Sequence, residues 1–256
     1  MYHPELYDLV TPASFRGDTE WYVARAQEAD GPILELGAGT GRITLQIAQA
    51  GCQIHALDAD PAMLDRLQQK LISLPPHVRD LVSVTAGDMR SFALPERFAL
   101  VIAPFRAFLH NLTEQDQLAC LVRVREHLRP GGRFAFNVYH PSLEYMANNA
   151  GAHAGLWRWV GTFPRHDGGW IVRSEATRYD TVRQQLQSEH RFEEFGPDGT
   201  LQRTSLHRLS LAYLYPPDIR RLLKEAGFVS VRIGGAFDGR PFENDTDELV
   251  IEAATA

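Results

Sequence analysis

Short apolar runs alternate with amphipathic stretches along the first 140 residues of the chain. Five runs have the length and composition of buried strands, at residues 33–36, 53–57, 81–86, 98–103 and 134–138. Helices are expected where apolar residues recur at helical spacing or follow a capping residue, at residues 19–28, 43–50, 61–71 and 114–128. This alternation predicts an α/β fold built on a parallel sheet.

The pattern changes after the fifth run. Residues 170–178, 182–192 and 204–213 alternate apolar and polar side chains, and the last two runs flank a Gly-Pro-Asp-Gly turn. We expect an antiparallel insertion of three or four strands here. A helix at 217–226 and strands at 228–233 and 248–253 then resume the first pattern. The prediction is one domain from residues 1–140 and 214–256, with residues 141–213 as an antiparallel β cap.

The first predicted strand runs directly into Gly37-Ala38-Gly39-Thr40-Gly41, and a helix follows. Glycine allows the chain to turn sharply and to pass close to a ligand, and a helix N-terminus favours negative or polar ligand groups. The arrangement predicts a site for a nucleotide-like cofactor. The spacing is G-x-G-x-G rather than the dinucleotide G-x-G-x-x-G, and Glu35 beside the loop would repel a pyrophosphate. Asp58 follows Gly41 by seventeen residues, at a spacing suited to accepting hydrogen bonds from ribose hydroxyls.

Residues 35–41 resemble motif I of class I S-adenosylmethionine-dependent methyltransferases. The triplet Gly87-Asp88-Met89 and the Leu-Arg-Pro-Gly-Gly of residues 128–132 resemble further segments of that family. The resemblance implies a Rossmann-like seven-stranded sheet whose last strand is antiparallel, with helices on both faces. It implies S-adenosylmethionine as the cofactor, and a small-molecule acceptor beneath the cap.

The resemblance also assigns cofactor contacts. Asp88 would accept a hydrogen bond from the adenine amine, and Tyr7 would lie in an amino-terminal segment that covers the cofactor. Two alternatives stay open: that the amino-terminal aromatic residues only anchor that segment, and that Met63 is a core residue. The expected cofactor-binding residues are Tyr7, Glu35, Gly37, Ala38, Gly39, Thr40, Gly41, Asp58, Ala59, Met63, Gly87, Asp88, Met89 and Phe105.

The segment after the fourth strand, Phe105-Arg106-Ala107-Phe108-Leu109-His110-Asn111, is similar to the Phe-Ser-Ser-x-Gly-His-Leu of sugar-amine N-methyltransferases. His110 falls on the active-site histidine of that group and is the candidate catalytic residue, as a base or as a group that orients an amine. Arg106 and Ala107 replace the two serines, which leaves the acceptor in doubt. Arg106 either binds an acceptor carboxylate or phosphate, or pairs with a surface acid. Tyr139 and His140 are further substrate candidates from their position alone.

Composition narrows the alternatives. The 256 residues carry a net charge of −6, which argues against a nucleic-acid-binding surface, and no stretch is apolar enough to span a membrane. Two distant cysteines and dispersed histidines predict neither disulfides nor a metal site, so the cytoplasm is the expected location. A homodimer is left open. The competing hypotheses are a nicotinamide-dependent oxidoreductase and a protein that binds the cofactor without turnover.

Overall fold

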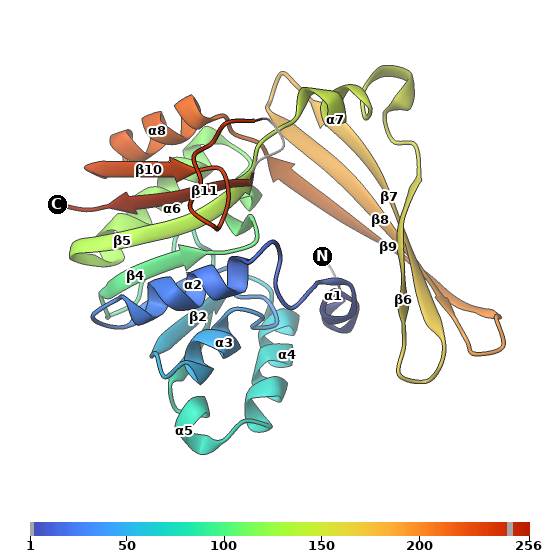
Figure 1. Ribbon diagram of the computed structural model, residues 1–256, viewed down its shortest axis with the longest axis horizontal. Coiled ribbons are helices and arrows are strands. Elements are labelled where there is room, and N and C mark those ends of the chain that lie inside the picture. The colour runs from blue at the N-terminus through green and yellow to red at the C-terminus, as the bar shows by residue number, and fades with distance from the viewer. Residues whose placement is uncertain (1–2, 245–247) are drawn as a thin grey trace.

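The computed structural model describes residues 3–244 and 248–256, and these form two β-sheets with a short helix, α1, between them (Figure 1). The strands are β1 Ile33–Leu36, β2 Ile54–Asp58, β3 Val82–Ala86, β4 Phe98–Ala103, β5 Leu128–Tyr139, β6 Arg158–Pro164, β7 Trp170–Asp180, β8 Gln185–Phe195, β9 Leu201–Ala212, β10 Ser230–Gly234 and β11 Glu248–Ala254. The helices are α1 Pro4–Val10, α2 Asp18–Gln27, α3 Thr44–Gln49, α4 Pro61–Ile72, α5 Pro76–Arg79, α6 Glu114–His127, α7 Leu143–Ala147 and α8 Pro216–Glu225, with 3₁₀ turns η1 Ala107–His110 and η2 Gly151–His153.

The large sheet has the strand order β10-β11-β5-β4-β1-β2-β3. Strands β1 to β5 pair in parallel, whereas β11 is antiparallel to both of its neighbours. The prediction of a seven-stranded sheet with an antiparallel last strand is confirmed. Because β1 to β5 are parallel, the loops that follow them meet at one edge of the sheet.

Helices cover both faces of the large sheet. Apolar residues of α2, α3 and α5 pack on one face around Ile33 and Ile54, and α4 packs beside them against Ala56. Helices α6 and α8 cover the opposite face, where Phe134 and Phe136 stack with ring centroids 4.6 Å apart. The central strands β1 and β4 are therefore buried on both sides, as their continuous apolar runs predict, whereas the edge strands β3 and β10 are partly exposed.

The small sheet, β6-β7-β8-β9, is antiparallel throughout and follows β5. The predicted insertion is confirmed, with four strands. Several boundaries differ: β7 ends at Asp180 and not 178, β9 spans Leu201–Ala212 and not 204–213, and β8 spans Gln185–Phe195, whereas the sequence pattern placed it at 182–192. The carboxylate of Asp180 accepts the N–H groups of Val182 and Arg183 at 3.1 and 3.0 Å, which folds these residues into a turn.

The helix predicted at 114–128 ends one residue early. Leu128 adopts an extended conformation and pairs with Phe98, so β5 already starts there and includes the Pro-Gly-Gly segment.

In the part of the chain that the structure describes, no helix is both long enough and apolar enough to cross a membrane.

Helix α1 was not predicted. Its Leu6 and Val10 are buried against Ile171 and Phe192 of the small sheet. A seven-residue helix is unstable alone in water, so these tertiary contacts stabilise it. Helix α1 is thus packed against the small sheet close to the edge of the large one (Figure 1).

Candidate cofactor and acceptor site

The glycine loop, residues 37–41, connects β1 to the start of α3. The N–H of Gly37 donates to the carbonyl of Leu57 at 2.8 Å, which ties the loop to β2. The N–H of Gly39 donates to Asp58 Oδ2 at 2.7 Å. The loop and the predicted ribose-binding carboxylate are therefore joined directly.

The three glycines of this loop serve two purposes. All have positive φ, at +70° for Gly37, +56° for Gly39 and +83° for Gly41. A Cβ at Gly41 would lie 2.3 Å from the side chain of Leu67, and one at Gly37 would lie 2.8 Å from that of Ala107, so both allow close packing. A Cβ at Gly39 would meet nothing within 4 Å. The backbone at Gly39 thus faces open space, where a ligand can approach it.

Glu35 lies beneath this loop and is 2% exposed. The hydroxyl of Thr44 donates to its Oε2 at 2.5 Å. Burial raises the pKa of Glu35 to about 7, although the Thr44 hydrogen bond and the charge of Arg42 lower it. The buried carboxyl group is thus only partly ionised near pH 7, and a cationic ligand group would favour its charged form.

Asp58 ends β2 and its two carboxylate oxygens are held by backbone N–H groups. Oδ2 bonds to Gly39, and Oδ1 accepts the N–H of Asp60 at 2.8 Å. Burial raises the pKa of Asp58, and these two hydrogen bonds oppose that rise. Each oxygen keeps a lone pair for a further donor. Of the neighbouring candidates, Ala59 is exposed and Met63 is buried in α4.

The Gly87-Asp88-Met89 segment follows β3. The N–H of Gly87 donates to the carbonyl of Asp58 at 2.9 Å, which joins this segment to the ribose side of the site. The carboxylate of Asp88, however, pairs with Arg90, whose hydrogen bonds lower its pKa. The Met89 methyl group comes within 3.9 Å of a Cβ built on Gly37. Met89 therefore approaches the glycine loop, while Asp88 is engaged by Arg90.

Helix α1 is attached to the loop through Asp8, a residue of the Tyr7-Asp8-Leu9 segment that resembles the family's opening but to which the sequence assigned no contact of its own. Its carboxylate accepts hydrogen bonds from the hydroxyl of Thr40 at 2.6 Å, from Arg66 Nε at 2.9 Å and from Lys70 Nζ at 2.6 Å. Burial raises the pKa of Tyr7, and the charges of Glu35 and Asp58 raise it further. The α1 segment thus lies next to the predicted cofactor acids.

Arg42 was also missed, although it directly follows the glycine loop. Its Nη1 and Nη2 bond to the two oxygens of the fully buried Asp18, at 2.9 and 2.6 Å. The guanidinium lies over the ring of Phe105, 4.9 Å from its centroid, and that ring makes an edge contact with Phe15. Arg42 therefore connects the amino-terminal segment to the loop after β4.

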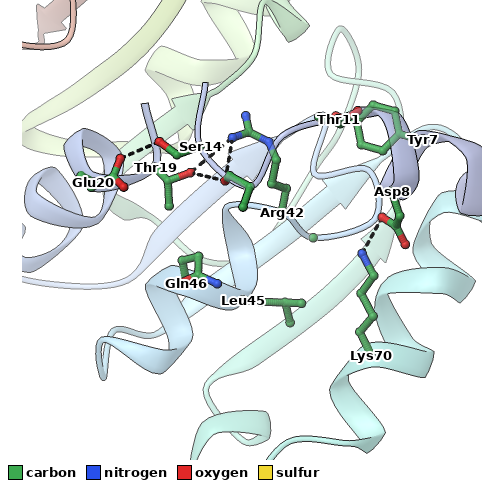
Figure 2. A pocket seen from close by; sticks show the side chains of 12 residues that line it. Tyr7, Asp8, Thr11, Ser14, Thr19, Glu20, Arg42, Leu45, Gln46 and Lys70 are labelled. Atoms are coloured by element: carbon green, nitrogen blue, oxygen red, sulfur yellow. Dashed lines mark hydrogen bonds and ion pairs between the residues drawn. The ribbon is translucent and has the colours of Figure 1, made fainter. Parts of the chain in front are cut away.

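A pocket of about 520 Å³ opens between the amino-terminal segment and the first turn of α3 (Figure 2). Its lining includes Tyr7, Lys70 and Gly41, but neither Gly39 nor Asp58. The pocket is therefore next to the glycine loop and separate from the open face at Gly39. The predicted cofactor-binding residues Gly39 and Asp58 therefore border that open face and not this pocket.

His110 ends the η1 turn, which lies against β9 of the small sheet. The amide of Gln185 donates to the carbonyl of Leu112 at 2.9 Å and ties the two parts together just beyond this turn. His110 is exposed to solvent on one side. Desolvation by the surrounding protein lowers the pKa of its imidazole, and the negative charge of Asp58 opposes that decrease. The imidazole is thus neutral at neutral pH, and it lies close enough to Asp58 for the two groups to interact electrostatically.

Arg106 pairs with an acid, which was one of its two predicted alternatives, but this acid is buried and not at the surface. Its Nε and Nη2 donate to Glu248 at 2.9 and 2.6 Å, and Glu248 is 2% exposed. Asn137 also donates to this carboxylate, at 2.7 Å. Sequence could not reveal the pair, because the two residues are 142 positions apart.

Tyr139 and His140 diverge at the end of β5. The ring of Tyr139 lies beside the Arg106 guanidinium, with 5.2 Å between the ring centroid and Cζ. Burial raises the pKa of the Tyr139 phenol, and the neighbouring Tyr179 of the small sheet raises it further. His140 instead contacts the rings of Tyr215 and Phe242. Tyr139 is therefore the one of the two that adjoins Arg106.

The strand order, the glycine loop after the first strand and the acids at successive strand ends define the class I S-adenosylmethionine-dependent methyltransferase fold. Residues 33–132 match the family model described as "Methyltransferase domain". Over these residues the chain is similar to methyltransferases of this class.

Known methyltransferases match nearly the full length of the chain. A cypemycin N-terminal methyltransferase from Streptomyces sp is 27% identical over 250 residues, which cover 96% of this chain and 93% of the relative. The CcbJ methyltransferase structure from Streptomyces caelestis has a TM-score of 0.79 at 26% identity and covers 99% of this chain and 96% of its own. The glycopeptide N-methyltransferase MtfA, solved with S-adenosyl-L-methionine, has a TM-score of 0.59 at 26% identity, covering 94% of each chain.

The predicted cofactor, S-adenosylmethionine, is the one with which the structure of MtfA was solved. The residues present fit it: Gly39 leaves room for a ligand, Asp58 can accept hydroxyl donors, and the buried Glu35 suits a cation. The nicotinamide hypothesis gains no support from these findings. The assignment of individual contacts remains a prediction.

Proposed function

We propose that this methyltransferase transfers a methyl group to an amine of a small-molecule or peptide acceptor. The observation that carries the proposal is a neutral, accessible His110 on a turn between the cofactor acids and the small sheet. The names of two relatives, an N-terminal methyltransferase and a glycopeptide N-methyltransferase, support an amine as the methylated group.

The cofactor, when bound, supplies a methyl group on a sulfonium sulfur that is open to in-line attack by an amine lone pair. The chain then has two tasks. Gly39, Asp58 and Glu35 hold and orient the cofactor side, and alignment of reactants can contribute about 7–11 kcal/mol to lowering the barrier. His110, neutral because of its lowered pKa, accepts a proton from the amine or a hydrogen bond that directs its lone pair.

In this proposal residues 1–140 and 214–256 form the cofactor domain, and residues 141–213 cover the acceptor. The contact of η1 with β9 and the Gln185 hydrogen bond support it, because they place the small sheet beside His110. The assigned cofactor contacts, Phe105 and Tyr7 among them, are part of the same proposal.

The test is to replace His110 by Ala and by Gln and to follow S-adenosylhomocysteine and N-methylated product by mass spectrometry, with a panel of peptide amines, amino sugars and hydroxyl compounds. We expect the parent protein to methylate amines, and both variants to lose about 10²–10⁴-fold in turnover while cofactor affinity is kept. Unchanged turnover would make His110 structural. Cofactor binding without product from any acceptor would favour the remaining alternative, a protein that binds the cofactor without turnover.

A further inference from the structure

Three segments of the chain meet at Gly37, the first residue of the glycine loop. A Cβ built on Gly37 would lie 2.8 Å from that of Ala107, in the turn after β4, and 3.9 Å from the Met89 methyl group, in the segment after β3. Met89 is partly buried and packs against the core of the large sheet. Its side chain therefore lies beside the backbone to which the cofactor is assigned.

Within the Gly87-Asp88-Met89 segment, Asp88 is already engaged. Both of its carboxylate oxygens accept hydrogen bonds from Arg90, which also bonds to Asp116 at 2.9 Å. An acceptor that is shared in this way contributes less to binding an adenine amine. This side of the site therefore depends more strongly on the position of the Met89 side chain.

A methionine side chain is unbranched and has three rotatable bonds, so it keeps one position only where a neighbour holds it. Asn111 provides such a contact, because its Nδ2 donates to Met89 Sδ at 3.2 Å. A thioether sulfur is a weak acceptor, so this bond contributes direction more than strength. It fixes the sulfur relative to the turn after β4.

The Asn111 amide is itself fixed by its surroundings. The residue is 2% exposed, and the same Nδ2 donates to the carbonyl of Phe108 at 2.9 Å. Its backbone carbonyl accepts a hydrogen bond from Nε2 of Gln117 in α6 at 3.0 Å. Burial raises the pKa of Cys120, also in α6, and a hydrogen bond with Asn111 opposes that rise. Asn111 thus connects α6 and the η1 turn to the segment after β3.

Packing alone does not require asparagine at position 111. A buried amide destabilises the fold unless it has hydrogen-bond partners, whereas leucine needs none. Leucine is also the residue at the corresponding position of the Phe-Ser-Ser-x-Gly-His-Leu motif. Leucine could not make the hydrogen bond to Met89 Sδ, which is the contact that reaches the cofactor side of the turn.

We infer that Asn111 is a positioning residue, which holds the Met89 side chain against the adenosyl part of the bound cofactor. The inference rests on the proposed function, in which Met89 belongs to the cofactor contacts. Asn111 acts through Met89 and not by touching the cofactor. Because Asn111 directly follows His110, it also connects this wall of the cofactor site to the turn that carries the candidate base.

The experiment is a double-mutant cycle measured by calorimetric titration with S-adenosylhomocysteine. It compares the parent protein, Asn111→Leu, Met89→Leu and the double variant. Asn111→Thr, alone and with Met89→Leu, is the second case, because its hydroxyl can donate to the Phe108 carbonyl and leaves no donor for Met89. Asn149→Leu is the matched control: Asn149 is also 2% exposed, and its Nδ2 donates to the carbonyl of Tyr145 in α7 at 2.8 Å. Urea unfolding without ligand shows that each variant is folded and measures its loss of stability.

We expect Asn111→Leu and Asn111→Thr each to weaken S-adenosylhomocysteine binding by about 3- to 10-fold when Met89 is present, and by less than about twofold when Met89 is already leucine. Asn149→Leu should bind as the parent does. An equal loss with and without Met89 would show a general structural role and overturn the inference, as would parent affinity in both Asn111 variants.

A second readout needs no ligand. Methyl NMR of the four methionines, with the Met89 signal assigned through its absence in Met89→Leu, reports whether that side chain keeps one position. Its chemical shift should move toward that of a freely rotating methionine in both Asn111 variants and stay unchanged in Asn149→Leu; a signal that stays in place in both Asn111 variants overturns the inference. Failure of the parent protein to bind S-adenosylhomocysteine would count against the proposed function itself, on which the inference rests.

Discussion

The open face at Gly39 allows the cofactor position to be tested by one added methyl group. Gly39→Ala places a Cβ where no protein atom lies within 4 Å, so it creates no clash inside the chain. Its cost to folding comes from the φ of +56°, which disfavours a residue with a side chain by about 1–2 kcal/mol. Alanine also lowers the conformational entropy of the unfolded chain, which offsets part of this cost. The net loss of folding stability is about 1 kcal/mol.

Gly51 provides the control. It follows α3 with φ +87°, and a Cβ there also meets nothing within 4 Å. Gly51→Ala should therefore cost the same stability, which corresponds to a fall in Tm of about 2–4 °C for a chain of this size. The two variants differ only in whether the methyl group enters the space assigned to the cofactor.

Calorimetric titration with S-adenosylmethionine separates the two effects. We expect Gly39→Ala to bind at least about tenfold more weakly, a loss of about 1.4 kcal/mol or more, and Gly51→Ala to bind as the parent does. Urea unfolding without ligand measures the shared cost in stability. Parent affinity in Gly39→Ala would falsify the placement of the cofactor over this loop.

Three further predictions concern acids near the loop. Asp58→Ala should weaken S-adenosylmethionine binding by about tenfold or more, because it removes the acceptor of ribose hydroxyls; calorimetry showing parent affinity would refute that role. Burial raises the pKa of Glu35 from 4.5 to about 7, so the folded protein binds this proton more tightly than the unfolded chain does. Its contribution to stability is therefore full below about pH 4.5 and is lost as pH rises to about 7, and Glu35→Gln should flatten the parent's fall in unfolding free energy over that window. Asp18→Ala should destabilise the fold by about 3–5 kcal/mol by leaving Arg42 without its buried partner, and a loss below about 1 kcal/mol in urea unfolding would contradict this.

The sequence predicted the parts of this fold that local patterns determine. Apolar runs and capping residues predicted the order of strands and helices, because each of these signals lies within a few residues of the element that it determines; the cap of α4, for example, is Asp60. The Gly-Pro-Asp-Gly turn similarly marked the β8–β9 hairpin. Helix α1 was missed because its seven residues depend on packing against the small sheet, although Pro4 at its first position was a usable signal.

Only the glycine loop and the residues close to it in motif spacing could be predicted from the sequence. The glycine loop and Asp58 carry motif spacing, whereas the partners that orient the remaining charges come from distant segments. Arg106 finds Glu248, and Arg42 finds Asp18, only when the chain is folded. One sequence contains no local signal for such pairs, so the partner of Arg106 became evident only from the structure.

Helix α1 touches both halves of the molecule: its apolar side packs on Ile171 and Phe192, while Asp8 bonds to Thr40 and to α4. This has a consequence for engineering. Grafting residues 141–213 from a relative, to give the enzyme a new acceptor, would leave a helix whose surface matches only the original sheet. A chimera should therefore exchange the first ten residues together with the graft, keeping the acid that contacts the glycine loop.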